Sequence, residues 1–276
     1  MRKCSIILIL LAIIPKFSYS QSIESWFPNK LNIQPFTANI LEARDGSSYL
    51  FGEKRLRLDA GISSDVYQVH NGNSTLSFGA DLFTFTRLRN ENNFRFPVET
   101  IDYFFGINSG YKVIENNYEY GFRIRLSHIS AHLVDGSYDE QNSVWRNGRV
   151  PFVYSREFIE VLPYYKINEF RIYGGFTYLF HRIPTTIGRG IYQAGFDYYL
   201  VNLAGKNVTP FLADDFKLSQ MGKYTGNNII EAGIKFGEYN GKGFRILVSY
   251  TSGKSIHGLY YDLNENYASF GFSFDL

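Results

Sequence analysis

Strict alternation of apolar and polar residues is the feature that most limits what this chain can fold into. Phe244, Ile246, Val248 and Tyr250, for example, are separated by single residues of mostly polar character. A period of two is typical of a β-strand whose two faces meet different surroundings, whereas an amphipathic helix repeats roughly every 3.6 residues. After residue 21 the sequence shows no amphipathic helical pattern of useful length. The pattern therefore predicts an all-β protein.

The alternation recurs in segments near the length of about 9–11 residues that a tilted strand needs to cross a bilayer. It predicts about twelve strands, of which the first is the weakest. They are expected at residues 32–41, 56–62, 76–86, 101–113, 118–130, 158–167, 170–180, 191–200, 208–217, 230–236, 244–250 and 267–276.

The connections between these segments alternate in length. Short ones are expected near residues 70–73, 115–117, 168–169, 204–206 and 239–242. Longer polar ones are expected near 42–54, 88–100, 131–153, 181–189, 218–227 and 252–266. Bacterial outer-membrane barrels combine short periplasmic turns with longer outer loops, and an even number of strands leaves both chain ends in the periplasm. The prediction is a closed antiparallel transmembrane β-barrel.

A secreted soluble β-sandwich or lipocalin-like barrel would show the same period with its apolar face inward. Charges of both signs, spread singly over nearly every strand, favour instead a polar lumen in which they pair. Barrels of this size are often filled by their own side chains, so an open pore is not implied. The residues predicted to line the lumen are Arg57, Asp59, Asp81, Arg123, Arg125, Arg171, Asp197, Asp214, Glu231, Lys235 and Arg245.

The N-terminus has the pattern of an export signal. Three residues with two basic side chains, Met1–Lys3, precede an apolar run, Cys4–Ile14, and a small-x-small site, Ser18–Ser20. The run is too short for an anchoring helix and breaks at Pro15. We expect residues 1–20 to be a signal peptide, 21–30 a periplasmic lead-in and 31–276 the barrel. Cys4, the one cysteine of the sequence, would be removed with the signal.

The amino-acid composition limits where the protein can reside and which kinds of molecule it can bind. The mean hydropathy of −0.19 is too low for a bundle of membrane helices, while 25 Phe and 22 Tyr suit lipid-facing strands and interfacial girdles. The formal charge of +2 shows no basic bias, so nucleic acid is not an expected partner. The expected location is the outer membrane of a Gram-negative bacterium, in contact with lipid and with other envelope proteins. The aromatic last strand suits recognition by the outer-membrane assembly machinery.

One predicted strand carries unusual chemistry. Side chains two apart on a strand share a face, so His128, Ser130 and His132 point the same way as the apolar Phe122 and Leu126. An imidazole and a hydroxyl on a lipid-facing wall are costly unless they are wet or paired. A base beside a hydroxyl is also the arrangement that acyl transfer needs.

This His-x-Ser arrangement resembles the one in outer-membrane phospholipase A and in lipid A deacylase, barrels with catalytic residues on the lipid-facing wall. The resemblance implies that Ser130 is the nucleophile and His128 the base of a serine-type lipid acyl hydrolase. It implies a third member among Asn142, Glu140 and Asp139 in the following loop. Those enzymes continue after Ser with Asn and a small residue, whereas Ala131 and His132 follow here.

A broader similarity covers most of the chain. It rests on segments 128–135, 154–157, 171–175, 210–215 and 250–258, which resemble an uncharacterised bacterial barrel family known as a domain of unknown function, number 1207. Its members tend to read His-x-Ser-Ser-His-Leu-Gly-Asp, so Ala131 and Val134 depart from the pattern. The resemblance implies an envelope protein with no established activity.

Other interpretations of the same residues stay open. His128 and Ser130 also suit interfacial polar residues that bond each other or lipid headgroups. His132 and Asp135, with His128, have the side-chain types of a metal site. Asp214 and its neighbour Asp215 suggest Ca²⁺, although such a pair without further spaced oxygens usually just lines a lumen or faces solvent.

Three functions are therefore compatible with the sequence. The first is an integral outer-membrane barrel with a structural, transport or complex-forming role. The second is the lipid acyl hydrolase that uses Ser130 and His128. The third is a secreted soluble β-protein.

Overall fold

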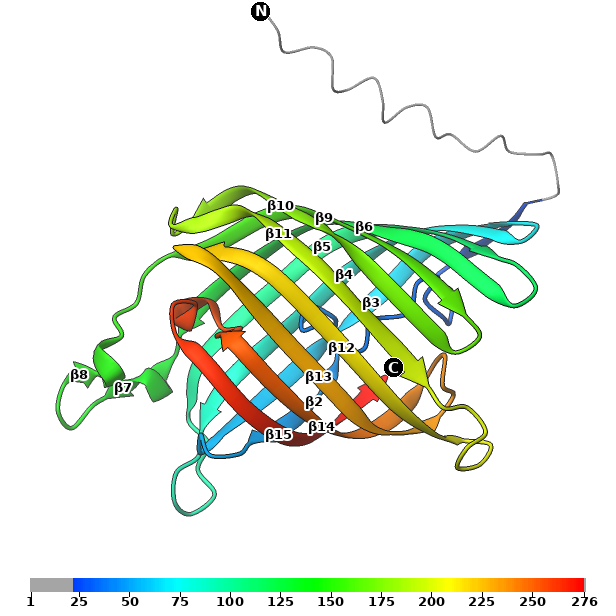
Figure 1. The fold of residues 1–276 in the computed structure, drawn as a ribbon. Coiled ribbons are helices and arrows are strands. Elements are labelled where there is room, and N and C mark those ends of the chain that lie inside the picture. The colour runs from blue at the N-terminus through cyan, green and yellow to red at the C-terminus, as the bar shows by residue number, and fades with distance from the viewer. Residues whose placement is uncertain (1–21, 276) are drawn as a thin grey trace, which may run out of the picture.

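The computed structural model describes residues 22–275, so the expected signal peptide lies outside the described residues. Long antiparallel strands form one tilted, closed sheet (Figure 1). The strands of this sheet are β1 (Ile23–Trp26), β2 (Asp45–Leu50), β3 (Arg55–Asn71), β4 (Ser74–Arg89), β5 (Val98–Ile114), β6 (Tyr118–Leu133), β9 (Tyr154–Ile167), β10 (Phe170–Ile183), β11 (Ile187–Tyr199), β12 (Val208–Met221), β13 (Lys223–Gly237), β14 (Gly243–Lys254) and β15 (Asn264–Asp275).

The sheet closes because β2 lies between β15 and β3, and β3 also pairs with β4. Of its 13 strands, β1 is attached only to β3, which leaves twelve in the ring. Closure satisfies the backbone groups that an open sheet would expose at its edges. The predicted fold class, a closed antiparallel barrel of about twelve strands, is confirmed.

The first barrel strand is not the one predicted. Residues 32–41 form no strand, and β2 (Asp45–Leu50) lies within the stretch expected to be a loop. Pro35 lacks the N–H group that a strand inside a sheet needs. The sequence of β2, Asp-Gly-Ser-Ser-Tyr-Leu, is rich in small residues and shows almost no apolar alternation. The pairing of β2 with two long neighbours makes it a strand despite that pattern.

The two ends of the barrel differ, and we call the end with the longer loops the outer end. There, loop 134–153 carries η1 (Asp135–Ser137), β7 (Tyr138–Asp139), β8 (Val144–Trp145) and η2 (Arg146–Gly148), and loop 255–263 carries η3 (Gly258–Tyr260). Two connections expected to be long are tight, because the strands on either side extend further: residues 184–186 join β10 to β11, and Gly222 alone joins β12 to β13. No helix within residues 22–275 is long and apolar enough to cross a membrane.

The apolar face of the sheet points outward and the charged face inward. Ile107 is 62% exposed and Leu82 61%, whereas Arg125 is 1% and Asp102 0% exposed. Exposed apolar side chains occur on every strand of the ring, far more than a soluble monomer tolerates, since its contiguous apolar patches rarely exceed a few hundred Å². The alternative of a soluble barrel, whose apolar face would lie inside, does not fit this arrangement.

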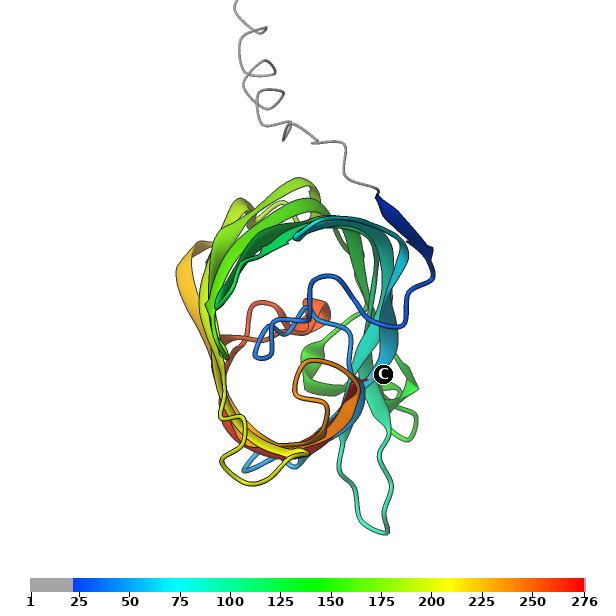
Figure 2. The same cartoon turned by 90° about the vertical axis from the view of Figure 1, so that its right-hand side faces the viewer.

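Two segments of the chain lie inside the ring of strands (Figure 2). Residues 31–44 enter the barrel, where Phe36 is fully buried and the Glu42 carboxylate accepts hydrogen bonds from Arg123 and Arg125. From the outer end, loop 255–263 folds inward and is held by Asp102, which accepts from His257 Nδ1 at 2.9 Å and from the Gly258 N–H at 2.7 Å. Backbone segments, and not side chains alone, therefore plug the barrel.

Candidate functional site

His128 and Ser130 lie on the outward face of β6, near its outer end. They share that face with the exposed Leu126, while Arg125 and Ile129 point inward and are buried. The strand places them there because side chains alternate between the two faces of a sheet. The imidazole and the hydroxyl thus face the surroundings of the barrel and not its lumen.

A carboxylate on the neighbouring strand holds His128. Glu157 on β9 stands directly opposite His128 in the β6–β9 register. Its Oε1 atom lies 2.7 Å from His128 Nδ1, and its Oε2 atom contacts Nδ1 of His181 on β10. Phe105 on β5 packs against the other side of the imidazole, with ring centroids 4.7 Å apart. Four adjacent strands therefore set the position of one imidazole.

The contact with Glu157 decides which nitrogen of His128 is available. An ionised carboxylate only accepts hydrogen bonds, so Nδ1 carries a proton and Nε2 is left as the basic nitrogen. Ser130 is the next outward residue on β6. Its cross-strand partner Ser155 donates to Glu157 at 2.8 Å. Among residues 22–275 the Ser130 hydroxyl has no hydrogen-bond partner, His128 included.

The loop residues expected to complete a triad lie elsewhere. Asn142 donates its side-chain amide to Asp139 at 3.1 Å, and Arg146 pairs with the same carboxylate at 3.2 Å. The hydrogen bond from Asn142 holds the pKa of Asp139 below its usual value. Glu140 is exposed in the same loop. None of Asp139, Glu140 and Asn142 contacts His128, because the loop closes on itself through this cluster.

Glu157, and not one of those loop residues, provides the carboxylate that contacts His128. The segment 154–157 appeared in the sequence only as part of a broader similarity, because nothing in the alternation reveals which residue of β9 faces His128. The signal that finds it is an acidic side chain at the start of an apolar, outward-facing row: Glu157 precedes Ile159, Val161 and Pro163 at intervals of two.

The residue pairs considered for metals are not assembled into sites. His132 faces outward beside the Tyr103 ring, and Asp135 accepts a hydrogen bond from the Gly136 N–H. Within the described part of the chain, no group of three His, Cys, Asp or Glu side chains could hold a metal ion.

Asp214 does not line the lumen, although the sequence predicted that it would. It shares the outward face of β12 with Leu212 and Phe216, whereas Asp215 is buried inside, 2.9 Å from the Tyr173 hydroxyl and 2.5 Å from Lys217 Nζ. Adjacent residues on a strand point to opposite faces. The two carboxylates therefore cannot hold one Ca²⁺ together.

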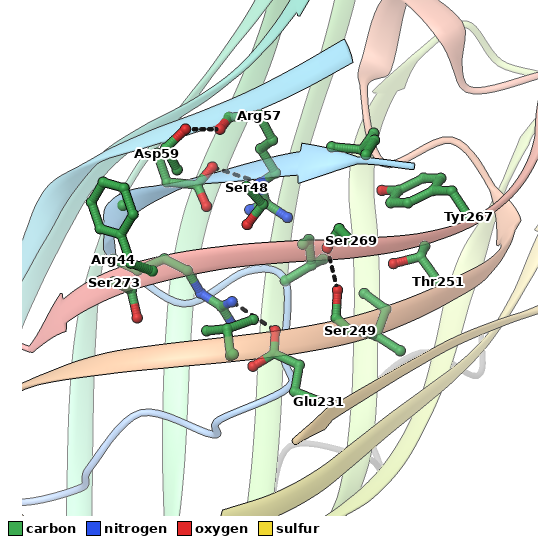
Figure 3. Close-up of a pocket in the computed structure, with 17 residues that line it drawn as sticks. Arg44, Ser48, Arg57, Asp59, Glu231, Ser249, Thr251, Tyr267, Ser269 and Ser273 are labelled. Carbon is green, nitrogen blue, oxygen red and sulfur yellow. Dashed lines mark hydrogen bonds and ion pairs between the residues drawn. The ribbon is translucent and has the colours of Figure 1, made fainter. Parts of the chain in front are cut away.

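The lumen is a network of opposite charges. Arg44 Nη1 lies 2.8 Å from Glu231 Oε1, and Arg57 Nε lies 2.6 Å from Asp59 Oδ1 (Figure 3). The other charges predicted to line the lumen also lie inside and are paired: Asp81 with Arg125, Arg123 with Glu42, Arg171 with Asp197, and Lys235 and Arg245 with Asp275. Pairing offsets the cost of removing these groups from water.

Comparison with known proteins agrees with this architecture. A profile of the family described as "Protein of unknown function (DUF1207)" matches residues 32–276. The chain belongs to this family. No curated protein sequence matches the DUF1207 chain.

Several solved structures are similar to this chain, and two of them are outer membrane phospholipases. Outer membrane phospholipase A from Escherichia coli shares 11% identity, covers 88% of this chain and 93% of its own, and gives a TM-score of 0.54. The outer membrane phospholipase dimer of Salmonella typhi with bound calcium shares 11% identity, covers 89% and 94%, and gives the same TM-score. At this identity the likeness establishes a shared outer-membrane barrel fold.

Proposed function

We propose that the protein is a serine acyl hydrolase that acts on membrane lipid from the outer wall of its barrel. Ser130 is the nucleophile, His128 Nε2 takes its proton, and Glu157 orients the imidazole. The observation that carries the proposal is the 2.7 Å contact between Glu157 Oε1 and His128 Nδ1, on the same face as Ser130.

The geometry suits attack on an ester that stays in the bilayer. With Nδ1 held by a carboxylate, Nε2 is free to approach a hydroxyl two residues further along the same strand, as in a nucleophile–base–orienter arrangement. The Ser130 hydroxyl turns without breaking a bond, because it has no partner among the described residues. In unliganded enzymes the nucleophile–base contact often tightens only when substrate binds.

The first test is fatty-acid release from phospholipid and from lipopolysaccharide by purified protein in nonionic detergent. Ser130→Ala should lower turnover by at least about 10³-fold, because it removes the nucleophile. Thr84→Ala is the control, since it removes an outward-facing hydroxyl of β4 that donates to the carbonyl oxygen of Ala60 and not to Glu157. Equal turnover by Ser130→Ala and the wild type would end the proposal.

The identity of the base is tested separately, because Ser130 lies between two histidines on one face. His128→Ala should lower turnover by about 10²–10⁴-fold. His132→Ala should have little effect, since no carboxylate among the described residues contacts His132. The reverse ranking would assign the base to His132.

We also propose that the protein resides in the bacterial outer membrane, which the outward apolar face and the barrel fold support. The assay is run with Ca²⁺ and with EDTA, because calcium is bound in the similar Salmonella typhi dimer. Lower turnover in EDTA than in Ca²⁺ would show that hydrolysis requires the ion.

A further inference from the structure

The outer half of the lumen holds a cavity of about 80 Å³, distinct from the site on the outer wall. Its walls are largely apolar and include Phe158, Leu179, Ile191 and Met221. Arg156 also lines it. The space exceeds what one buried water needs, and an apolar cavity with a cation at one side is the form of an amphiphile-binding pocket.

Arg156 differs from most arginines of the lumen because no carboxylate among the described residues pairs with it. Its Nε atom is buried without a hydrogen-bond partner, and its guanidinium lies only against the Tyr154 ring, 5.4 Å from the centroid. Within residues 22–275 the arginines without an ion pair are Arg95, Arg156, Arg182 and Arg189. Arg95 and Arg189 are exposed, so the arginines of the lumen without an ion pair, among the described residues, are Arg156 and Arg182.

Arg182 is the cross-strand partner of Arg156. The β9–β10 register sets the two opposite each other, on the face that alternates with His181 and Glu157 and thus points inward. The one hydrogen bond of Arg182 runs from its Nε to the carbonyl oxygen of Ile187. Like charges directly opposite on neighbouring strands destabilise a sheet, and an anion bound between them would remove that penalty.

The other charged residues that line the cavity also give it a net positive charge. Its lining contains Arg156, Lys217 and Lys254 against the single carboxylate of Asp215, which gives three positive charges against one negative, a net of +2. Lys217 is already paired with Asp215, and Lys254 donates to the carbonyl oxygen of Asp262. Arg156 is therefore the group best placed to receive an anion.

We propose that this cavity is a binding site for a small anionic amphiphile, with its carboxylate or phosphate head on Arg156. Arg182, the cross-strand neighbour of Arg156, adds positive charge beside the head group. The short apolar tail of the amphiphile packs against Phe158, Leu179, Ile191 and Met221. A guanidinium pairs strongly with both kinds of head group. The site is separated from Ser130 by the barrel wall, so it exists whether or not the wall catalyses hydrolysis.

The test is isothermal titration of purified protein in nonionic detergent, with titration into empty micelles subtracted. The probes are octanoate and octyl phosphate, compared with octanol, which lacks the charge, and with acetate and inorganic phosphate, which lack the tail. We expect saturable binding of at least one charged octyl probe and affinity at least about tenfold weaker for the other three. The stronger of octanoate and octyl phosphate identifies the head group.

Arg156→Gln should weaken the bound probe by about tenfold or more. Arg189→Gln is the matched control, because Arg189 lies at the same end of the barrel but on its exposed surface, and it should bind within about twofold of the wild type. Met221→Trp, which fills the tail region and leaves both arginines, should also weaken binding and serves if Arg156→Gln fails to fold. Equal binding by wild type, Arg156→Gln and Met221→Trp, or no binding of either charged probe, would refute the site.

Discussion

Glu157 shows how one residue changes the chemistry of an apolar outer wall. Its two carboxylate oxygens contact His128 and His181, and Ser155 adds a third donor. Glu157 is about as enclosed as His128, each 25% exposed at the side chain. A carboxylate so near lipid is costly unless it is paired, so the two imidazoles and the carboxylate depend on each other for their position.

At this scale the first prediction concerns orientation of the base. Glu157→Gln should lower lipid hydrolysis by about 10²-fold, because an amide fixes the His128 tautomer less well than a carboxylate and does not stabilise the imidazolium. Turnover is measured by fatty-acid release, and His181→Ala is the control that removes the second contact of Glu157 without touching His128. If Glu157→Gln and His181→Ala hydrolyse lipid equally well, orientation by Glu157 is refuted.

A second residue-scale prediction concerns Glu42 inside the lumen. Glu42→Gln leaves Arg123 and Arg125 without their nearest carboxylate and should lower the free energy of unfolding by about 3 kcal/mol. The loss lies at the low end for a broken buried pair because Asp81 and Glu160 still face these arginines.

Urea unfolding in phospholipid vesicles, followed by intrinsic fluorescence, measures the effect of Glu42→Gln. Glu238→Gln is the control, because it breaks an ion pair with Lys30 in which both side chains are about 60% exposed. A Glu42→Gln protein as stable as the Glu238→Gln protein would contradict the role of Glu42.

At the scale of elements, the N-terminal segment is the main departure from the predicted fold. Residues 32–41 alternate weakly, like an edge strand, but their side chains are buried on several sides inside the lumen. Arg171 donates to the carbonyl oxygens of Gln34 and Pro35, which gives this backbone partners that a strand would find in a ladder. The segment is a plug that the arginines of the wall hold in place.

The plug leads to a prediction about ion conductance through the lumen. Replacing residues 31–41 by a Gly/Ser sequence of equal length should produce single-channel conductance in planar bilayers, because Phe36 and its neighbours would no longer fill the barrel. The wild type should be silent under the same conditions. A conducting wild type would show that the plug leaves a path and would favour a transport role.

At the scale of the whole molecule, barrel closure decides which face meets which surroundings. The ring turns a mostly apolar face outward and encloses most of its charged side chains together with the plug. Transfer of this apolar face from water into lipid lowers the free energy of the barrel. In a soluble protein, burial of an apolar core plays the same part. We therefore expect the barrel to be stable in a bilayer or in detergent.

This arrangement predicts the behaviour of the intact protein. It should fractionate with the outer membrane, and unheated samples should migrate differently from boiled ones on SDS gels because the closed sheet resists detergent. The control is a marker protein of the periplasm in the same fractions. Recovery of the protein in the periplasmic fraction, with no shift on heating, would overturn its placement in the membrane.

The alternation in the sequence was sufficient to predict an all-β chain, the approximate strand ranges and the sharing of one face by His128 and Ser130, because a period of two is a local property of each strand. It was not sufficient for β2, whose small residues carry no pattern, or for residues 32–41, whose weak pattern reflects burial in the lumen. From the sequence, Asp214 was likewise predicted to line the lumen, and yet its side chain points outward.

The tertiary structure decided what depends on pairing between distant strands. Glu157 meets His128 because β6 and β9 are neighbours across a 20-residue loop, residues 134–153, and no local period reports such a register. The same holds for Arg156 opposite Arg182 and for Glu42 between Arg123 and Arg125. The sequence by itself determined a barrel of strands with a His-x-Ser row on its apolar face, whereas closure and register determined the partners of those side chains.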